Sequence, residues 1–92
     1  MTKRAECIVY GEVQGVSYRD FVRTSARRAG LLGSVRNLPD GTVEVVAEGE
    51  ESVLREFLKA LKEGYPFAKV SQIREVWSEA VGDFKTFLIL KS

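Results

Sequence analysis

Two stretches with helical periodicity, each lying between stretches typical of strands, most strongly limit how this chain can fold. The first runs from about Ser17 to Ala29 and the second from Glu50 to Lys62. In both, apolar or small residues recur at spacings of three and four, as on one face of an amphipathic helix. These residues are Tyr18, Phe21, Val22, Ser25, Ala26 and Ala29 in the first stretch, and Val53, Leu54, Phe57, Leu58 and Leu61 in the second. Such a helix must cover its apolar face, so a second structural layer is expected.

The remaining segments indicate five strands that would form this second layer. They are expected at residues 4–11, 34–38, 42–48, 69–79 and 84–91, with turns at Pro39-Asp40-Gly41 and at Gly82-Asp83. Residues 42–48 alternate, with Val43, Val45 and Ala47 on a packed side and Thr42, Glu44 and Glu48 on a solvent-facing side. The order β-α-β-β-α-β-β predicts an α+β fold. It is a ferredoxin-like β-α-β-β-α-β sandwich with an extra C-terminal strand and two helices on one face of a mainly antiparallel sheet.

Length and charge narrow the classes of protein and partner. The chain has 92 residues, enough for one compact domain, and residues 1–92 are expected to form it. Fourteen Lys and Arg residues against 13 Asp and Glu give a net charge of +1, too weak a field to attract nucleic acid or a membrane surface. No apolar run approaches the ~20 residues of a membrane-spanning helix, and the N-terminus lacks an apolar signal segment. We expect a cytoplasmic monomer without a nucleic-acid or membrane partner.

The composition also excludes several kinds of catalytic site. The chain contains no histidine, which is the commonest general base near neutral pH and the commonest metal ligand. Its single cysteine, Cys7, cannot form an internal disulfide. Cys7 lies in an apolar strand, so a buried core thiol is expected rather than a nucleophile. An enzyme built on this chain would have to work without the usual catalytic side chains.

The predicted topology brings two distant segments together. In a right-handed β-α-β unit the two strands run parallel, even when another strand lies between them. Their C-terminal ends, at Gly11 and near Asn37, should therefore lie at the same edge of the sheet. Ligands tend to bind outside the carboxyl ends of parallel strands. We expect the loop that follows Gly11 to share a pocket with Asn37.

This loop has the features of an anion site. Gly15 permits a left-handed backbone, and the first amides of the following helix lack partners within the helix. Successive N–H groups from Gln14 to Arg19 would surround a phosphoryl group, and Arg19 would present its planar guanidinium to two oxygens. The loop matches neither the Walker motif nor the dinucleotide fingerprint. On these residues alone, an ordinary strand–helix turn with a solvated arginine remains an open alternative.

Two multi-residue motifs connect the chain with a known family. The stretch Gly11-x-Val13-Gln14-Gly15-Val16-x-Tyr18-Arg19 resembles the first motif of the acylphosphatase family. The stretch Gly33-Ser34-Val35-Arg36-Asn37-Leu38-Pro39-Asp40-Gly41-Thr42-Val43, followed by Gly49, resembles its second. The order of the motifs, their separation and the predicted topology also agree with the family. The resemblance therefore covers nearly the whole chain.

The resemblance implies an enzyme that hydrolyses the carboxyl–phosphate bond of acyl phosphates without a metal or cofactor. Arg19 and the backbone N–H groups of Gln14, Gly15, Val16, Ser17, Tyr18 and Arg19 would bind the phosphoryl group. Asn37 would position the attacking water, and inorganic phosphate would be both product and competitive inhibitor. The leaving group is a carboxylate, whose conjugate acid has a pKa of roughly 4, so no general acid is needed. The absence of histidine is therefore compatible with this chemistry.

Position 34 departs from the family pattern. It carries serine, where the family usually has an aromatic residue. Neighbouring residues of a strand point to opposite faces, so Ser34 and Asn37, three positions apart, should lie on opposite sides of the sheet. We expect this departure to affect packing or stability rather than chemistry.

Three other functions remain open on the sequence. A nucleic-acid-binding ferredoxin-like module would need exposed aromatic residues beside a basic rim, and residues 42–48 carry no aromatic residue. A non-catalytic phosphate sensor on the same fold would not need both Arg19 and Asn37. A domain of a larger maturation enzyme that handles carbamoyl phosphate would be accompanied by further domains, so a stand-alone enzyme is expected.

Overall fold

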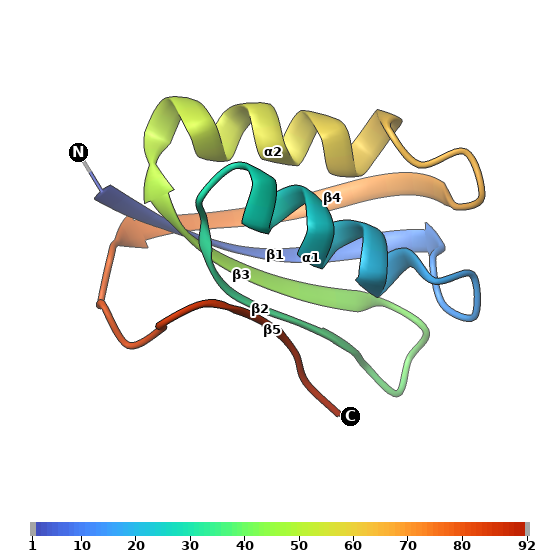
Figure 1. The fold of residues 1–92 in the computed structure, drawn as a ribbon. Coiled ribbons are helices and arrows are strands. Elements are labelled where there is room, and N and C mark those ends of the chain that lie inside the picture. Colours follow the sequence, from blue (N-terminus) through green and yellow to red (C-terminus); the bar gives the residue numbers. More distant parts are fainter. Residues whose placement is uncertain (1, 92) are drawn as a thin grey trace.

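The computed structural model describes residues 2–91 as two helices packed on one face of a five-stranded sheet (Figure 1). The strands are β1 (Thr2–Glu12), β2 (Leu32–Asn37), β3 (Val43–Glu50), β4 (Lys69–Glu79) and β5 (Phe87–Ile89), and the helices are α1 (Tyr18–Arg28) and α2 (Glu51–Glu63). The strand order is β4-β1-β3-β2-β5. All neighbouring pairs are antiparallel except β2 and β5, which run parallel. The predicted α+β sandwich with an extra C-terminal strand is confirmed.

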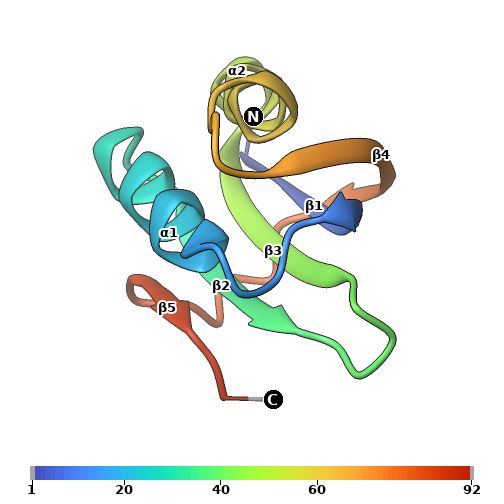
Figure 2. The ribbon, with the colours of Figure 1, turned by 90° about the vertical axis from the view of Figure 1, so that its right-hand side faces the viewer.

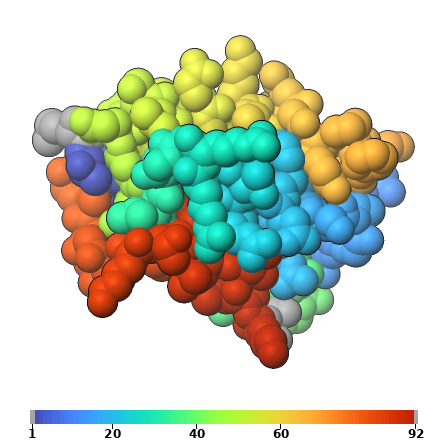
Figure 3. All heavy atoms as spheres, in the orientation of Figure 1, coloured from blue at the N-terminus to red at the C-terminus, as the bar shows by residue number. Residues whose placement is uncertain are grey.

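The core lies between the helices and the sheet. Figure 2 shows both helices on the same side of the sheet, and in Figure 3 their atoms cover much of the face turned to the viewer, with the C-terminal segment below α1. The buried residues are Tyr18, Val22 and Ala26 of α1, Leu54, Phe57, Leu58 and Leu61 of α2, and Ala5, Cys7, Val9, Val35, Val43, Val45, Ala47 and Phe87 of the sheet. Each large apolar side chain in this set stabilises the fold by roughly 1.5–3 kcal/mol relative to exposure. Burial of the Cys7 thiol, as predicted, raises its pKa to about 12.

The predicted boundaries agree with the observed elements within two residues, except at the C-terminal strand. The strand expected at residues 84–91 is limited to Phe87–Ile89. Residues 80–86 instead cross from β4 at one edge of the sheet to β5 at the other, on the side without helices (Figure 1). The longer strand was a wrong prediction because pairing with the β2 edge begins only at Thr86, whose carbonyl oxygen accepts a hydrogen bond from Gly33 N at 3.0 Å. No helix within residues 2–91 combines the length and apolar character needed to cross a membrane.

Glu48 holds this crossing segment in place. The prediction of a solvent-facing Glu48 is wrong, because its side chain is only 4% exposed. One carboxylate oxygen, Oε2, accepts hydrogen bonds from the Val81 amide (2.9 Å) and from Arg4 Nη1 (3.0 Å), and Oε1 accepts one from the Gly82 amide (3.0 Å). Burial pushes the pKa of Glu48 upward, but these hydrogen bonds outweigh burial and hold the pKa below its usual value. Glu48 therefore fixes the segment that leads to β5.

The C-terminal ends of β1 and β2 lie at the same end of the sheet, as predicted. Each pairs with β3 in antiparallel direction, so the two run parallel with β3 between them. Just before the end of β1, a register shift interrupts its pairing with β4 between Tyr10 and Gly11. At Gly11 φ is +131°, and a Cβ atom would lie 2.0 Å from the carbonyl oxygen of Lys69. Only glycine permits this approach, which releases the chain from the sheet into the following loop.

Candidate functional site

A pocket of about 380 Å³ opens beyond the C-terminal ends of β1 and β2. Its walls come from three parts of the chain: the β1–α1 loop with the first turn of α1, the end of β2, and β5. The lining residues are Val13, Gly15, Ser17, Tyr18, Arg19, Asp20, Asn37 and Ile89. The predicted meeting of the loop with Asn37 is therefore present in the structure.

The β1–α1 loop carries a series of backbone N–H groups without partners. The amides of residues 15–20 donate no hydrogen bond to a described residue, and the helical pattern begins with Phe21 N and Ser17 O at 3.2 Å. The backbone is left-handed at Gly15 (φ +78°) and at Ser17 (φ +61°). Left-handed residues of this kind turn successive N–H groups into one concave surface that binds anions. For Ser17 this conformation is strained, and such strain is often found at functional sites.

Charge at the pocket comes from Arg19 and Asp20. The guanidinium of Arg19 forms no hydrogen bond or ion pair with any residue in the described part of the chain. Asp20, by contrast, accepts a hydrogen bond from Arg23 Nη2 at 3.0 Å, one turn further along α1. The Asp20 charge is therefore partly offset, while Arg19 remains available for a ligand. Together with the N-terminal end of α1, Arg19 makes the pocket favourable for an anion.

Asn37, at the end of β2, lines the same pocket. Its side-chain oxygen, Oδ1, is buried and accepts no hydrogen bond from the residues that the structure describes. A buried polar atom left without a partner costs about 1–3 kcal/mol. Buried polar groups are normally paired with protein or ordered water, so the unpaired Oδ1 distinguishes Asn37 from the other buried polar side chains within residues 2–91.

Gln14 and Val16 do not line the pocket, although both belong to its loop. Gln14 Nε2 donates to the carbonyl oxygens of Leu38 and Thr42, at 2.8 Å in each case, so its side chain reaches the β2–β3 turn. The carbonyl oxygen of Val16 accepts a 2.6 Å hydrogen bond from the hydroxyl of Tyr65. Both residues shape the loop. Direct contact of their own amides with a ligand remains a prediction.

Tyr18 anchors the start of α1 to α2. Its side chain is 1% exposed, and its hydroxyl donates to the carbonyl oxygen of Leu61 at 2.8 Å. Burial raises the pKa of Tyr18. The hydroxyl therefore stays protonated near neutral pH and cannot act as a base in the pocket.

Four residues of the site are not predicted from the sequence, although Val13 belongs to the first family motif. Val13 and Ile89 form apolar walls, Asp20 forms part of the rim, and Tyr65 supports the loop from behind. Ile89 reaches the pocket because β5 pairs in parallel with β2 and ends at the same edge. An acidic residue in the first turn, such as Asp20, is common in any helix. Only the three-dimensional structure assigns these residues to the site.

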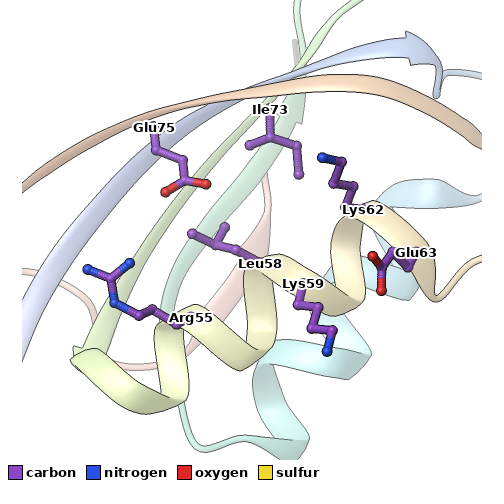
Figure 4. A pocket seen from close by; sticks show the side chains of 7 residues that line it. All are labelled: Arg55, Leu58, Lys59, Lys62, Glu63, Ile73 and Glu75. Carbon is purple, nitrogen blue, oxygen red and sulfur yellow. The ribbon is translucent and has the colours of Figure 1, made fainter.

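A second hollow, of about 280 Å³, lies between α2 and β4 and lacks these features. It is lined by Arg55, Leu58, Lys59, Lys62, Glu63, Ile73 and Glu75. Figure 4 shows Arg55 and Lys62 extending from α2 toward β4, whereas Lys59 points away. Arg55 is already paired with Glu51 at 2.8 Å, and the hollow mixes charges of both signs. Within residues 2–91 the only buried side-chain polar atom without a partner is Oδ1 of Asn37, so the loop pocket is the candidate site.

Comparisons with known proteins agree with the family resemblance that the two sequence motifs indicated. A family model described as Acylphosphatase matches residues 5–89. An acylphosphatase from Dehalococcoides mccartyi is 48% identical over 85 residues, which cover 91% of this chain and 93% of that protein. The crystal structure of an acylphosphatase from Bacillus subtilis has a TM-score of 0.91 at 41% identity, covering 96% of this chain and 98% of that one. Full-length HypF matches with a TM-score of 0.84 at 26% identity, covering 99% of this chain but 12% of that longer chain. This chain therefore belongs to the acylphosphatase family, whose members are enzymes that act on small-molecule acyl phosphates.

Proposed function

We propose that this chain hydrolyses acyl phosphates to a carboxylate and inorganic phosphate. A water oxygen forms a bond to phosphorus, the bond between phosphorus and the acyl oxygen breaks, and the carboxylate leaves with the electron pair. The backbone amides of residues 14–19 and the guanidinium of Arg19 hold the phosphoryl oxygens, and Asn37 holds the water in line. The transition state of phosphoryl transfer is loose and carries its charge on the equatorial oxygens. Positioning and electrostatic stabilisation therefore supply the catalysis.

The unpaired Oδ1 of Asn37 is the observation that carries this proposal. The pocket's backbone amides in the β1–α1 loop and the guanidinium of Arg19 are hydrogen-bond donors, and the Asp20 carboxylate at the rim is already paired with Arg23. Phosphoryl oxygens are acceptors, so they bind to these donors and not to Oδ1. Oδ1 needs an O–H or N–H donor, and the attacking water provides one. An amide oxygen orients this water but is too weak a base to remove its proton.

Proton transfer does not require a protein side chain in this reaction. A carboxylate whose conjugate acid has a pKa of roughly 4 leaves without being protonated. The proton of the water passes to a phosphoryl oxygen of the substrate, which becomes part of the inorganic phosphate. Tyr18 and Cys7, whose pKa values are both raised by burial, stay protonated throughout. The chain contains no histidine, and this scheme needs none.

The substrate specificity of hydrolysis tests the proposal. Benzoyl, acetyl and carbamoyl phosphate are compared with phenyl phosphate, an unactivated monoester whose phenolate is a much poorer leaving group. We expect repeated turnover of the acyl phosphates, slow or no turnover of phenyl phosphate, and competitive inhibition by inorganic phosphate. EDTA should leave the rates unchanged. Equal rates with phenyl phosphate, or strong loss of activity in EDTA, would contradict the scheme.

The same assay separates an enzyme from a phosphate sensor. A non-catalytic sensor would bind inorganic phosphate in calorimetry and leave every acyl phosphate intact. The monomeric state and the cytoplasmic location remain predictions, which sedimentation velocity and cell fractionation would test.

A further inference from the structure

The side chain of Gln14 joins the two segments on which the proposed reaction depends. Its Nε2 lies 2.8 Å from the carbonyl oxygen of Leu38 and 2.8 Å from that of Thr42, and both hydrogen bonds are partly buried. Gln14 directly precedes Gly15, which lines the pocket, and Leu38 directly follows Asn37. The contact therefore lies at the start of the proposed phosphate-binding loop and, through Leu38, one residue from Asn37 at the proposed water site.

The two carbonyl groups belong to a turn that is closed by its own hydrogen bonds. Leu38 N donates to Thr42 O at 2.9 Å, and Gly41 N donates to Leu38 O at 3.2 Å. Asp40 accepts from Thr42 through both the amide (3.0 Å) and the hydroxyl (2.6 Å). A carbonyl oxygen accepts two hydrogen bonds, and a side-chain amide nitrogen donates two. Gln14 thus donates both of its Nε2 protons. Each of the two carbonyl oxygens accepts one hydrogen bond from Gln14 and one from a backbone amide of the turn.

No backbone pairing joins the ends of β1 and β2, because β3 lies between them. The two hydrogen bonds of Gln14 are a direct side-chain link between the β1–α1 loop and the β2–β3 turn. A change in the distance between the loop and the turn would move a phosphoryl group on the loop relative to a water held at Asn37. Displacement requires the reacting atoms to be aligned at about 3–3.5 Å, and a misplacement of about 1 Å can cost 100-fold in rate.

We propose that Gln14 is a positioning residue that sets the distance between the phosphoryl group and the attacking water. This inference rests on the proposed function. Gln14 acts through Asn37 and the loop, and its side chain does not touch the substrate. Its loss should therefore lower kcat and leave the binding of phosphate largely intact.

The variant Gln14→Met tests this role, because methionine has nearly the same size and no N–H donor. We expect kcat for benzoyl phosphate to fall roughly 10- to 100-fold, with the inhibition constant of inorganic phosphate within about threefold of wild type. The matched control is Gln72→Met, at an exposed position of β4, which should keep the wild-type kcat. Gln14→Asn retains the amide on a shorter side chain that can reach only one carbonyl. It should give an intermediate kcat and serves as a second variant if Gln14→Met does not fold.

A double-mutant cycle distinguishes positioning from general support of the fold. If Gln14 acts through Asn37, adding Gln14→Met to Asn37→Ala should lower kcat by less than about threefold, because coupled residues are not additive. Any of three results would overturn the inference. These are an equal loss of kcat in both backgrounds, a parallel rise of the phosphate inhibition constant, and a wild-type kcat in both Gln14→Met and Gln14→Asn.

Wild-type turnover is measured first. If the wild type fails to hydrolyse benzoyl phosphate, the proposed function itself fails, whereas active wild type with an unaffected Gln14→Met excludes only the positioning role.

Discussion

The hydroxyl of Tyr65 donates a 2.6 Å hydrogen bond to the carbonyl oxygen of Val16 and so holds the β1–α1 loop from outside the pocket. In a trans peptide, the N–H of the next residue points away from the carbonyl oxygen. Fixing Val16 O on the Tyr65 side therefore directs the N–H of Ser17 to the other side, and Ser17 lines the pocket. The ring of Tyr65 is itself held by stacking on Phe21, with centroids 4.8 Å apart.

The variant Tyr65→Phe removes this hydrogen bond and keeps the stacking. A neutral hydrogen bond contributes about 0.5–1.5 kcal/mol, so we expect the affinity for inorganic phosphate to fall roughly three- to tenfold. Isothermal titration calorimetry measures this change. Tyr10→Phe, on the helix-free face near Arg74, is the matched control and should bind phosphate like the wild type. Unchanged affinity in Tyr65→Phe would show that the loop keeps its shape without Tyr65.

Replacement of Arg19 should separate binding from folding. Arg19 has no partner among the described residues, so Arg19→Ala should change the free energy of unfolding by less than about 0.5 kcal/mol. Phosphate binding should weaken strongly and turnover should be almost abolished. Arg19→Lys keeps the charge without the planar fork and should recover only part of the affinity. Arg28→Ala, at the far end of α1, is the control, and equal activity in Arg19→Ala and Arg28→Ala would exclude the proposed role of Arg19.

Replacement of Asn37 should affect turnover much more than binding. Asn37→Ala removes the acceptor that orients water, so we expect kcat to fall roughly 100-fold or more. The inhibition constant of inorganic phosphate should change little, because the loop amides and Arg19 remain. Steady-state kinetics with phosphate as inhibitor provide both values. An Asn37→Ala enzyme with full turnover would refute the assignment of water to Oδ1.

Glu48 should make the stability of the fold depend on pH. Because its pKa is lowered in the folded state, the stabilisation by ionised Glu48 is present above its ordinary pKa and is lost as the pH falls through the folded-state pKa. Glu48→Gln should lower the free energy of unfolding by about 1.5–3 kcal/mol at pH 7. The difference from wild type should shrink as the pH falls below about 4.3, the ordinary pKa of a glutamate, because the unfolded chain takes up this proton before the folded protein does. Urea unfolding at pH 7 and pH 3.5 measures both values.

The control for this prediction is Glu44→Gln. Glu44 pairs with Arg36 at 2.8 Å, but both side chains are partly exposed, so the expected loss is below about 1 kcal/mol. An equal loss for Glu48→Gln at both pH values would show that the charge of Glu48 does not hold the crossing segment.

The meeting of Asn37 with the β1–α1 loop could be predicted from the sequence. It depends on the order of the elements, which periodicity predicts, and on the right-handedness of β-α-β units, which is a general rule of protein folds. The opposite orientations of Ser34 and Asn37 follow in the same way and are confirmed. Ser34 pairs with Val46, on the face away from the helices, and Asn37 pairs with Val43, on the core side.

The path of residues 80–86 could not be predicted in this way. The alternation in β3 places Glu48 on the face of the sheet away from the helices. A charged residue on such a face is normally solvated. The burial of Glu48 depends on the amides of Val81 and Gly82, which are distant in the sequence and carry no side-chain signal. The placement of Ile89 in the pocket wall and the contact of Tyr65 with the loop are likewise tertiary contacts without a local pattern.

Hydrolysis of benzoyl phosphate in ¹⁸O-labelled water tests the central claim most directly. Mass spectrometry of both products shows where the water oxygen is incorporated. Attack at phosphorus, by a water held at Asn37 on a phosphoryl group held by the loop, predicts one ¹⁸O atom in the inorganic phosphate and none in the benzoate. Incorporation of ¹⁸O into the benzoate would contradict this account, because it would show attack at the acyl carbon.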